Sequence, residues 1–141
     1  MEQNVEILAI LQARVGSTRL PFKVLANVSG KPMLLWQIER ILRSKRIDRL
    51  IVATGQDSEN DPIQNLAESA GVSVVRGSEE NVLSRFIKVL NTFPAQTIVR
   101  LTGDCPLTDP KIIDRCIEEF TRADERIDYL SNTILRTYPD G

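Results

Sequence analysis

The chain has 141 residues, of which 42% are hydrophobic and 26% charged, and its composition is that of one ordinary folded domain. No apolar run approaches the ~18 residues of a membrane span, and no leader opens the chain, so we predict a cytoplasmic protein. The absence of histidine excludes imidazole-based catalysis and histidine-ligated zinc. Residues 1–50 hold nine Lys/Arg against four Asp/Glu, whereas residues 51–141 hold nine against fifteen. This asymmetry favours a phosphate-rich ligand held partly through a metal and disfavours duplex nucleic acid.

Strand-like and helix-like patterns alternate along the whole chain. Nearly continuous apolar runs predict strands that are buried on both faces. The predicted strands are 5–13, 49–54, 72–75 and 96–101, with a final short strand at 127–130. The rhythm indicates a three-layer α/β/α fold with a mostly parallel sheet, and a single domain over residues 1–141.

Apolar residues at helical spacing predict a helix between each pair of strands and another after residue 109. Asp61 is expected to cap the second helix and Gly71 to end it, and Asp109 to cap the fourth. The third helix is expected to carry Glu79 and Glu80 in its first turn. Its predicted inner face consists of Val82, Leu83, Phe86, Ile87 and Leu90. That of the fourth helix consists of Ile112, Ile113, Cys116, Ile117 and Phe120.

The loop after the first strand is the strongest candidate for a binding site, because ligands of open parallel sheets bind at the carboxyl ends of strands. The segment 12–23 (QARVGSTRLPFK) combines three cations, Arg14, Arg19 and Lys23, with Gly16 and the hydroxyl of Ser17. Free backbone N–H groups and charge-assisted hydrogen bonds suit a polyphosphate. The alternative is a solvated basic loop. The segment is neither a Walker loop nor a GxGxxG fingerprint.

The loop after the fourth strand, 100–106 (RLTGDCP), places Asp104 just past a buried strand. Gly103 before it can adopt a positive φ, and Pro106 stiffens the exit. One carboxylate together with substrate phosphates is a common setting for Mg²⁺. Asp104 is therefore either a magnesium ligand or a residue that bonds its own turn, and the spacing does not decide between them.

The ends of the other two strands carry weaker signals. Thr54 and Gly55 follow the second strand and provide a hydroxyl group and a small residue that leaves space for a ligand. Gly77 and Ser78 follow the third strand and lead toward a helix N-terminus, where backbone amides can meet a base or phosphate. A simple capping role for Ser78 is the favoured interpretation.

The two main loops resemble the cytidylyltransferase family, which includes CMP-sugar synthetases, and among its members the group of spore coat polysaccharide biosynthesis protein F. The resemblance rests on residues 10–21 (ILQARVGSTRLP) with Lys23, and on 100–107 (RLTGDCPL). Segments 52–54 (VAT), 76–83 (RGSEENVL) and 138–141 (YPDG) are also similar. The resemblance implies a Rossmann-like nucleotide-diphospho-sugar transferase fold and transfer of CMP from CTP to a sugar, with release of pyrophosphate.

The resemblance also implies roles for individual residues. Gln12 and Ala13 would lie near the nucleotide. Gly77 and Ser78 would flank the cytosine or ribose, and Asp104 would bind the cofactor Mg²⁺. The triphosphate would be held by Arg14, Ser17, Arg19 and Lys23. The expected catalytic residues are Arg14, Lys23 and Asp104. The full set of expected nucleotide-binding residues is Gln12, Ala13, Arg14, Gly16, Ser17, Arg19, Lys23, Thr54, Gly77, Ser78 and Thr102.

The expected partners are CTP and a sugar acceptor, without nucleic acid or membrane, and a homodimer in the full-length protein. Many relatives have glycine before the loop lysine, where this chain has the bulky Phe22. Relatives are also longer, so the chain is expected to be the N-terminal, nucleotide-binding part of such an enzyme and to bind nucleotide without turnover. The alternatives are a guanylyl- or uridylyltransferase of the same fold, or a non-catalytic nucleotide-binding domain.

Overall fold

The computed structural model describes residues 5–123 and 127–139 and confirms the parallel α/β architecture. Four parallel strands form one sheet in the order β5-β4-β1-β6. Its strands are β1 (Ile7–Gln12), β4 (Arg49–Gly55), β5 (Ser73–Gly77) and β6 (Thr97–Thr102). The helices are α1 (Met33–Ile41), α2 (Asp61–Ser69), α3 (Val82–Thr92) and α4 (Pro110–Arg122). Short elements are η1 (Lys23–Leu25), η2 (Ser58–Asn60) and the hairpin strands β2 (Asn27–Val28) and β3 (Lys31–Pro32).

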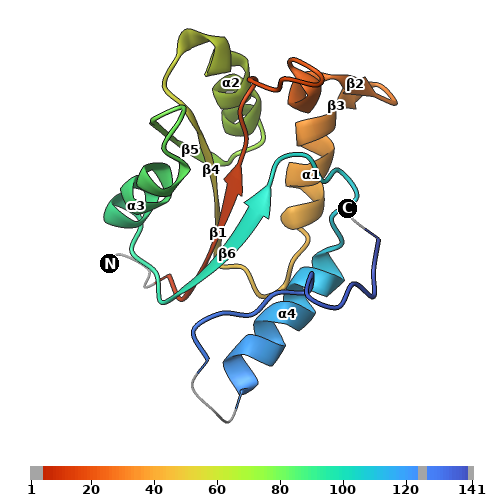
Figure 1. Ribbon diagram of the computed structural model, residues 1–141, viewed down its shortest axis with the longest axis vertical. Helices are drawn as coiled ribbons and strands as arrows, with labels where there is room; N and C mark the ends of the chain where they lie inside the picture. The colour runs from red at the N-terminus through yellow and green to blue at the C-terminus, as the bar shows by residue number, and fades with distance from the viewer. Residues whose placement is uncertain (1–4, 124–126, 140–141) are drawn as a thin grey trace.

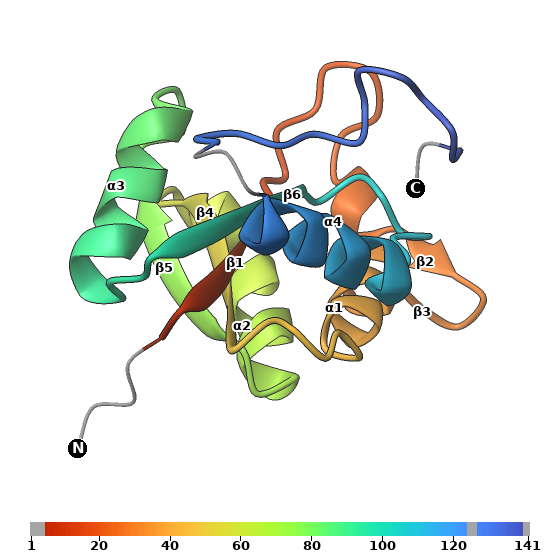
Figure 2. The same ribbon diagram turned by 90° about the horizontal axis from the view of Figure 1, so that it is seen from below.

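The helices cover both faces of the sheet, as the predicted three layers require. Figures 1 and 2 show α3 on one face and α1 and α2 on the other. All four strands of the sheet run in the same direction, so their carboxyl ends lie at one edge. The central strand β1 is apolar throughout because it is covered on both sides; residues 8–11 have no exposed surface.

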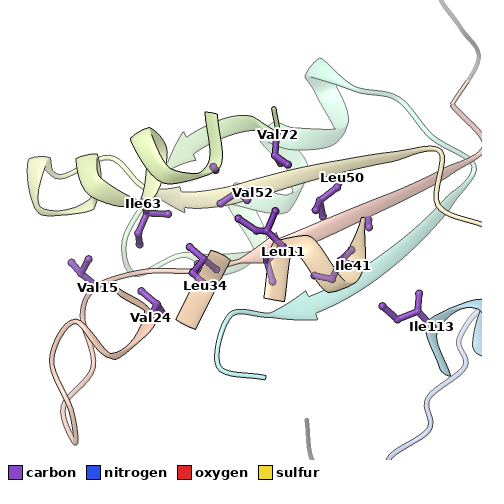
Figure 3. Packing of buried hydrophobic residues seen from close by; sticks show 14 of the residues in the cluster. Leu11, Val15, Val24, Leu34, Ile41, Leu50, Val52, Ile63, Val72 and Ile113 are labelled. Carbon is purple, nitrogen blue, oxygen red and sulfur yellow. The ribbon is translucent and has the colours of Figure 1, made fainter. Parts of the chain in front are cut away.

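The larger part of the hydrophobic core lies between the sheet and α1, α2 and α4. Figure 3 shows Leu11 and Val52 of the sheet packed with Leu34 and Ile41 of α1 and Ile63 of α2. The last helix, α4, joins this core through Ile113 and Ile117. A smaller core on the other face joins residues of β1, β4 and β5 to Val89 of α3. The layers of the domain are therefore held together mainly from the α1 side.

Several helix boundaries follow the predicted signals. Asp109 accepts a hydrogen bond from the backbone N–H of Lys111 (2.8 Å) and caps α4. Gly71 has φ = 76°, a left-handed conformation that closes α2. The prediction for Asp61 is wrong, because Asp61 is the first residue of α2 and makes no capping bond. The helix starts one residue earlier than the sequence suggests because the preceding η2 turn leads directly into it.

The third helix is rotated relative to the predicted face. Leu83 and Ile87 are 70% and 50% exposed, whereas Arg85 and Val89 have no exposed surface. The acidic residues 79–80 precede the helix instead of forming its first turn, and Asn81 is the cap residue. A leucine and an isoleucine at helical spacing suggested an inner face, but the bulky stem of Arg85 takes the buried position instead.

The predicted final strand at 127–130 is wrong: the described residues 127–139 contain no strand. Most of this segment is exposed and extends beside α4 (Figure 1). Of the similar motif at 138–141, Asp140 and Gly141 lie outside the described residues. Among the described residues, no helix is both long and apolar enough to cross a membrane.

Candidate functional site

A crevice of about 310 Å³ lies at the carboxyl ends of β1 and β6, beside the loop that follows β1. Eight of the eleven residues predicted to bind nucleotide line it together with the predicted metal ligand Asp104, although they come from two segments about ninety residues apart. The eight are Gln12, Ala13, Arg14, Gly16, Ser17, Arg19, Lys23 and Thr102. Thr18, Val24 and Gly103 complete the lining.

The loop after β1 is anchored by its apolar residues. Ala13, Val15 and Val24 are buried in the main core, whereas Arg14 and Arg19 are exposed. The backbone N–H of Phe22 donates to the carbonyl of Val15 (3.1 Å) and closes the loop. Alternating anchored and exposed residues thus hold the cations on the open side of the loop, where a polyanion can reach them.

Phe22 has an unusual backbone conformation, with φ = 58° and ψ = 18°. This left-handed conformation favours glycine and costs an ordinary residue about 1 kcal/mol. It directly precedes Lys23, the first residue of η1. The bulky Phe22 thus occupies a turn conformation that glycine would adopt without strain.

Gly103 is required by a close approach of two strand ends and not by a positive φ, which corrects the sequence-based expectation. Its N–H donates to the carbonyl of Gln12 (2.7 Å). A Cβ atom at position 103 would lie 2.9 Å from that carbonyl oxygen and 2.9 Å from the Cβ of Ala13. Any larger residue would push Asp104 away from the loop after β1.

Asp104 and Lys23 face each other across the crevice. The Nζ of Lys23 lies 3.5 Å from Oδ2 of Asp104, and both side chains are partly exposed. Partial burial works to raise the pKa of Asp104, but the hydroxyl of Thr102 and the charge of Lys23 outweigh it, so the pKa is lowered. Asp104 is thus a carboxylate at neutral pH, ready to accept a cation.

Magnesium fits this carboxylate only together with a second source of oxygen ligands. The described residues contain no cluster of three or more His, Cys, Asp or Glu that could hold a metal. Asp104 is the one acidic residue that lines the crevice in the described part of the chain. Mg²⁺ commonly binds one or two carboxylates plus phosphate oxygens. The donor set therefore fits an ion shared between Asp104 and a bound nucleotide.

The remaining three predicted residues lie outside the crevice lining. Thr54 is completely buried, and its hydroxyl has no partner among the described residues. Ser78 does not cap α3, contrary to the favoured interpretation. Its hydroxyl accepts from the N–H of Asn81 (3.0 Å), and Asn81 is the residue that caps the helix, accepting from the N–H of Ser84 (2.9 Å). Two successive turns, each closed by a hydrogen bond from a backbone N–H to a side-chain oxygen, therefore connect β5 to α3.

Asn60 joins three loops at this edge of the sheet, although no sequence pattern pointed to it. The side chain is 1% exposed. Its Oδ1 accepts from the N–H of Val15 (3.1 Å) in the loop after β1. Its Nδ2 donates to the carboxylate of Glu79 in the loop after β5. One buried amide thus fixes the loop of Arg14 relative to the loop of Ser78.

Arg85 is a second residue that the sequence analysis missed. It lies on α3 with no exposed surface, and none of its three guanidinium nitrogens has a hydrogen-bond partner among the described residues. Burial lowers the pKa of the guanidinium, Glu79 opposes this shift, and Arg14 adds to it. Arg85 shares a side of α3 with the buried Val89, but an exposed arginine can stand at the same spacing, so the sequence did not single it out.

A larger hollow of about 580 Å³ lies between the end of α1 and α4, away from the predicted residues. Its lining includes Arg40, Arg43, Lys45 and Lys111. Asp114, in the same hollow, accepts hydrogen bonds from Ser44 and from the backbone of Lys45 and Arg46. These bonds tie the end of α1 to α4, which is a structural role.

Comparison with known proteins places the chain among nucleotidyltransferases. Residues 8–137 match the family described as Cytidylyltransferase. The spore coat polysaccharide biosynthesis protein SpsF of Bacillus subtilis strain 168 is 40% identical over 134 residues, which cover 92% of this chain and 56% of that protein. The 3-deoxy-manno-octulosonate cytidylyltransferase of Trichlorobacter lovleyi is 37% identical over 117 residues, covering 82% of this chain and 45% of that protein.

The fold agrees with these relatives. The structure of a cytidylyltransferase from Leptospira borgpetersenii superimposes with a TM-score of 0.83 at 36% identity, covering 88% of this chain and 52% of that one. The fold is that of the nucleotide-diphospho-sugar transferases, as the family resemblance implied. The chain spans about half the length of the curated relatives it matches.

Proposed function

Because the chain belongs to the cytidylyltransferase family, we propose that it binds CTP for transfer of CMP to a sugar or sugar acid in polysaccharide or glycoconjugate synthesis, with release of pyrophosphate. The observation that carries the proposal is the crevice between the loops after β1 and β6. It brings three cations and one ionised carboxylate together from distant parts of the sequence. The sugar-acid cytidylyltransferase among the relatives supports an acceptor of that class.

The proposed reaction forms a bond between an acceptor hydroxyl oxygen and the α-phosphorus of CTP. The bond from that phosphorus to the oxygen bridging the α- and β-phosphates breaks, pyrophosphate leaves, and the hydroxyl proton passes to solvent. Arg14, Arg19 and Lys23 neutralise the phosphates and hold them in line, which is the main requirement of phosphoryl transfer. A magnesium ion shared with Asp104 would supply further charge neutralisation. No step needs histidine.

Thermal unfolding of the chain with CTP, UTP, GTP or ATP, each with and without Mg²⁺, tests the proposal. A ligand at ~100 times its Kd stabilises a protein by about 2.7 kcal/mol, which raises the midpoint by several degrees. We expect the largest rise with CTP, and a larger rise when Mg²⁺ is present. A preference for GTP or UTP would indicate another transferase of this fold, and no rise with any nucleotide would contradict the proposal for this chain.

Activity is a separate measurement on the same sample. Release of pyrophosphate from CTP in the presence of a sugar acid indicates turnover, whereas tight binding without release indicates a nucleotide-binding unit. Inorganic pyrophosphate added to a sample with bound CTP should compete for the same cations, and this competition reports on the triphosphate part of the site alone.

A further inference from the structure

The guanidinium of Arg85 is the most costly unpaired group among the described residues. It is completely buried, and Nε and both terminal nitrogens lack an acceptor. Buried charges in proteins are normally paired, because removing a charge from water without compensation costs several kcal/mol. Glu79 compensates part of the charge, but the three nitrogens have no hydrogen-bond acceptor in the described part of the chain, so they are available to a ligand that brings acceptors.

The backbone around Arg85 is shaped to admit its side chain. A Cβ at Gly77, the last residue of β5, would lie 2.8 Å from Cγ of Arg85. The neighbouring strand β4 also ends in glycine, Gly55, and a Cβ there would collide with the carboxylate of Glu79. These two glycines are in register at the carboxyl ends of adjacent strands. The side chains of Arg85 and Glu79 occupy the space that a residue with a Cβ would fill.

The charges that act on Arg85 indicate where its guanidinium end lies. They belong to Glu79 in the loop after β5 and to Arg14 in the loop after β1. Arg14 lines the crevice that contains the other cations. Arg85 belongs to α3, which covers one face of the sheet (Figure 1), and its stem lies against Gly77 at the carboxyl end of β5, within range of the charges of Glu79 and Arg14.

Arg85 differs from the cations assigned to the phosphates in how far its side chain is buried. Arg14 and Arg19 are exposed, as suits groups that meet a hydrated triphosphate. Arg85 has no exposed surface in the nucleotide-free chain, so its guanidinium must shift toward the carboxyl edge of the sheet to meet a base, in a contact from which water is excluded. A guanidinium is a rigid planar fork that binds two adjacent acceptors well. Cytosine has two such acceptors, O2 and N3. In uracil N3 carries a proton, so a donor would face a donor.

We propose that Arg85 donates hydrogen bonds to O2 and N3 of cytosine and thereby selects CTP over UTP. The inference rests on the proposed function, since it names the residue that reads the base at the same site. Guanine also presents two adjacent acceptors, O6 and N7, and the thermal-unfolding series with GTP described above tests whether it binds as well as cytosine. A base with an N3 proton leaves a buried donor unpaired, a loss that typically corresponds to a ten- to hundredfold lower affinity.

The first arm of the test changes the ligand and leaves the protein intact. Isothermal titration of the wild-type chain compares CTP with UTP and with 3-deaza-CTP, in which a C–H group replaces N3. We expect both analogues to bind at least about tenfold more weakly than CTP. Equal binding of CTP and 3-deaza-CTP would overturn the role of N3, and therefore of Arg85, without affecting the proposed function. Failure of CTP itself to bind would contradict both.

The second arm changes the protein. Arg85→Met keeps a long unbranched side chain and removes the charge. We expect this variant to bind CTP, UTP and 3-deaza-CTP with nearly equal affinity, and to unfold at a temperature no lower than the wild type because an uncompensated buried charge is gone. A variant that keeps the wild-type preference for CTP would refute the assignment. Arg85→Lys keeps the charge without the fork, so it should bind triphosphates but discriminate less.

Arg49→Met is the matched control. Arg49 is exposed at the amino end of β4, the opposite edge of the sheet, where its guanidinium lies 5.2 Å from the ring of Phe93. The same chemical change there should leave all three affinities at wild-type values. If Arg49→Met and Arg85→Met lose base discrimination to the same extent, the effect is a general loss of structure and the proposal fails.

Discussion

The two faces of the sheet differ in what they bury. On the α1 side, fifteen buried apolar residues among those described form one cluster with α1, α2 and α4. On the α3 side the corresponding cluster has seven, and a buried arginine lies beside it. The strand β6 is also less covered, since Ile98 is 43% exposed. The α1 face therefore supplies most of the apolar burial that stabilises the fold. The α3 face instead buries a charged group, which does not by itself stabilise a fold.

The difference between the faces predicts where a core substitution has its largest effect. Leu34→Ala, in the centre of the α1 cluster, should destabilise the chain by about 2–5 kcal/mol because it removes buried methyl groups and leaves a cavity. Leu83→Ala makes the same change on α3, where the side chain is 70% exposed, and should stay within about 0.5 kcal/mol of the wild type. Urea unfolding of the two variants makes the comparison, and similar losses would contradict the division between the faces.

Asp104 belongs to the edge where the two faces meet, and its substitution should affect binding without affecting folding. Asp104→Asn should remove the increase in nucleotide affinity that Mg²⁺ provides, a loss of about 10- to 100-fold, while the unfolding midpoint of the free chain stays the same. Asp61→Asn, at an exposed ion pair with Arg76, is the matched control and should keep the full magnesium effect. An unchanged magnesium effect in Asp104→Asn would exclude Asp104 as a ligand.

The same carboxylate predicts a pH dependence. Because the pKa of Asp104 is below its ordinary value of 3.8 in the folded chain, the carboxylate is charged throughout the neutral and mildly acidic range. CTP takes up a proton on its terminal phosphate at about pH 6, so the magnesium effect is compared between the wild type and Asp104→Asn at each pH. The wild type should keep the larger effect from pH 8 to about pH 5, and equal effects in the two proteins at pH 5 would contradict the lowered pKa of Asp104.

Substitution of Arg14 tests whether the exposed cations contact the phosphates of the nucleotide. Arg14→Ala should weaken CTP by about tenfold and CMP by less, since an exposed cation at this loop contacts phosphates and the triphosphate carries more charge. Titration with the two nucleotides at fixed ionic strength measures the difference. Equal losses for CTP and CMP would instead assign Arg14 to the base or ribose. Raising the salt concentration should reduce the loss, because the contact is exposed.

The smallest effect is expected at Phe22, which has a left-handed backbone. Phe22→Gly relieves the backbone strain at position 22 but makes the unfolded chain more flexible. These two effects oppose each other, so the net change in unfolding free energy should be within about 1 kcal/mol. Phe22→Ala keeps the strain and loses the ring, and should be less stable than Phe22→Gly. The opposite order, measured by thermal unfolding, would show that the ring and not the backbone conformation sets the stability of this loop.

The sequence predicted the sheet, the four helices and the two loops of the crevice because each depends on local signals. Apolar runs identified β1 and β4, and the carboxyl-end rule brought Arg14 and Asp104 to the same edge. Arg85 and Asn60 were missed because their importance depends on tertiary burial. An arginine on a helix and an asparagine in a turn are ordinary on a surface, and only the packed structure shows that both are buried. The exposed Leu83 and Ile87 misled the assignment of the inner face of α3 for the same reason.

Mapping CTP onto the chain by NMR tests the central claim most directly. In ¹H–¹⁵N spectra recorded with CTP and Mg²⁺, we predict the largest shifts at the backbone amides of residues 12–23, 77–79 and 102–104, with a side-chain Nε–H signal of Arg85 that moves with CTP and not with pyrophosphate. Shifts concentrated at the basic hollow between α1 and α4, around Arg43 and Lys111, would contradict the assignment of the nucleotide site to the carboxyl edge of the sheet.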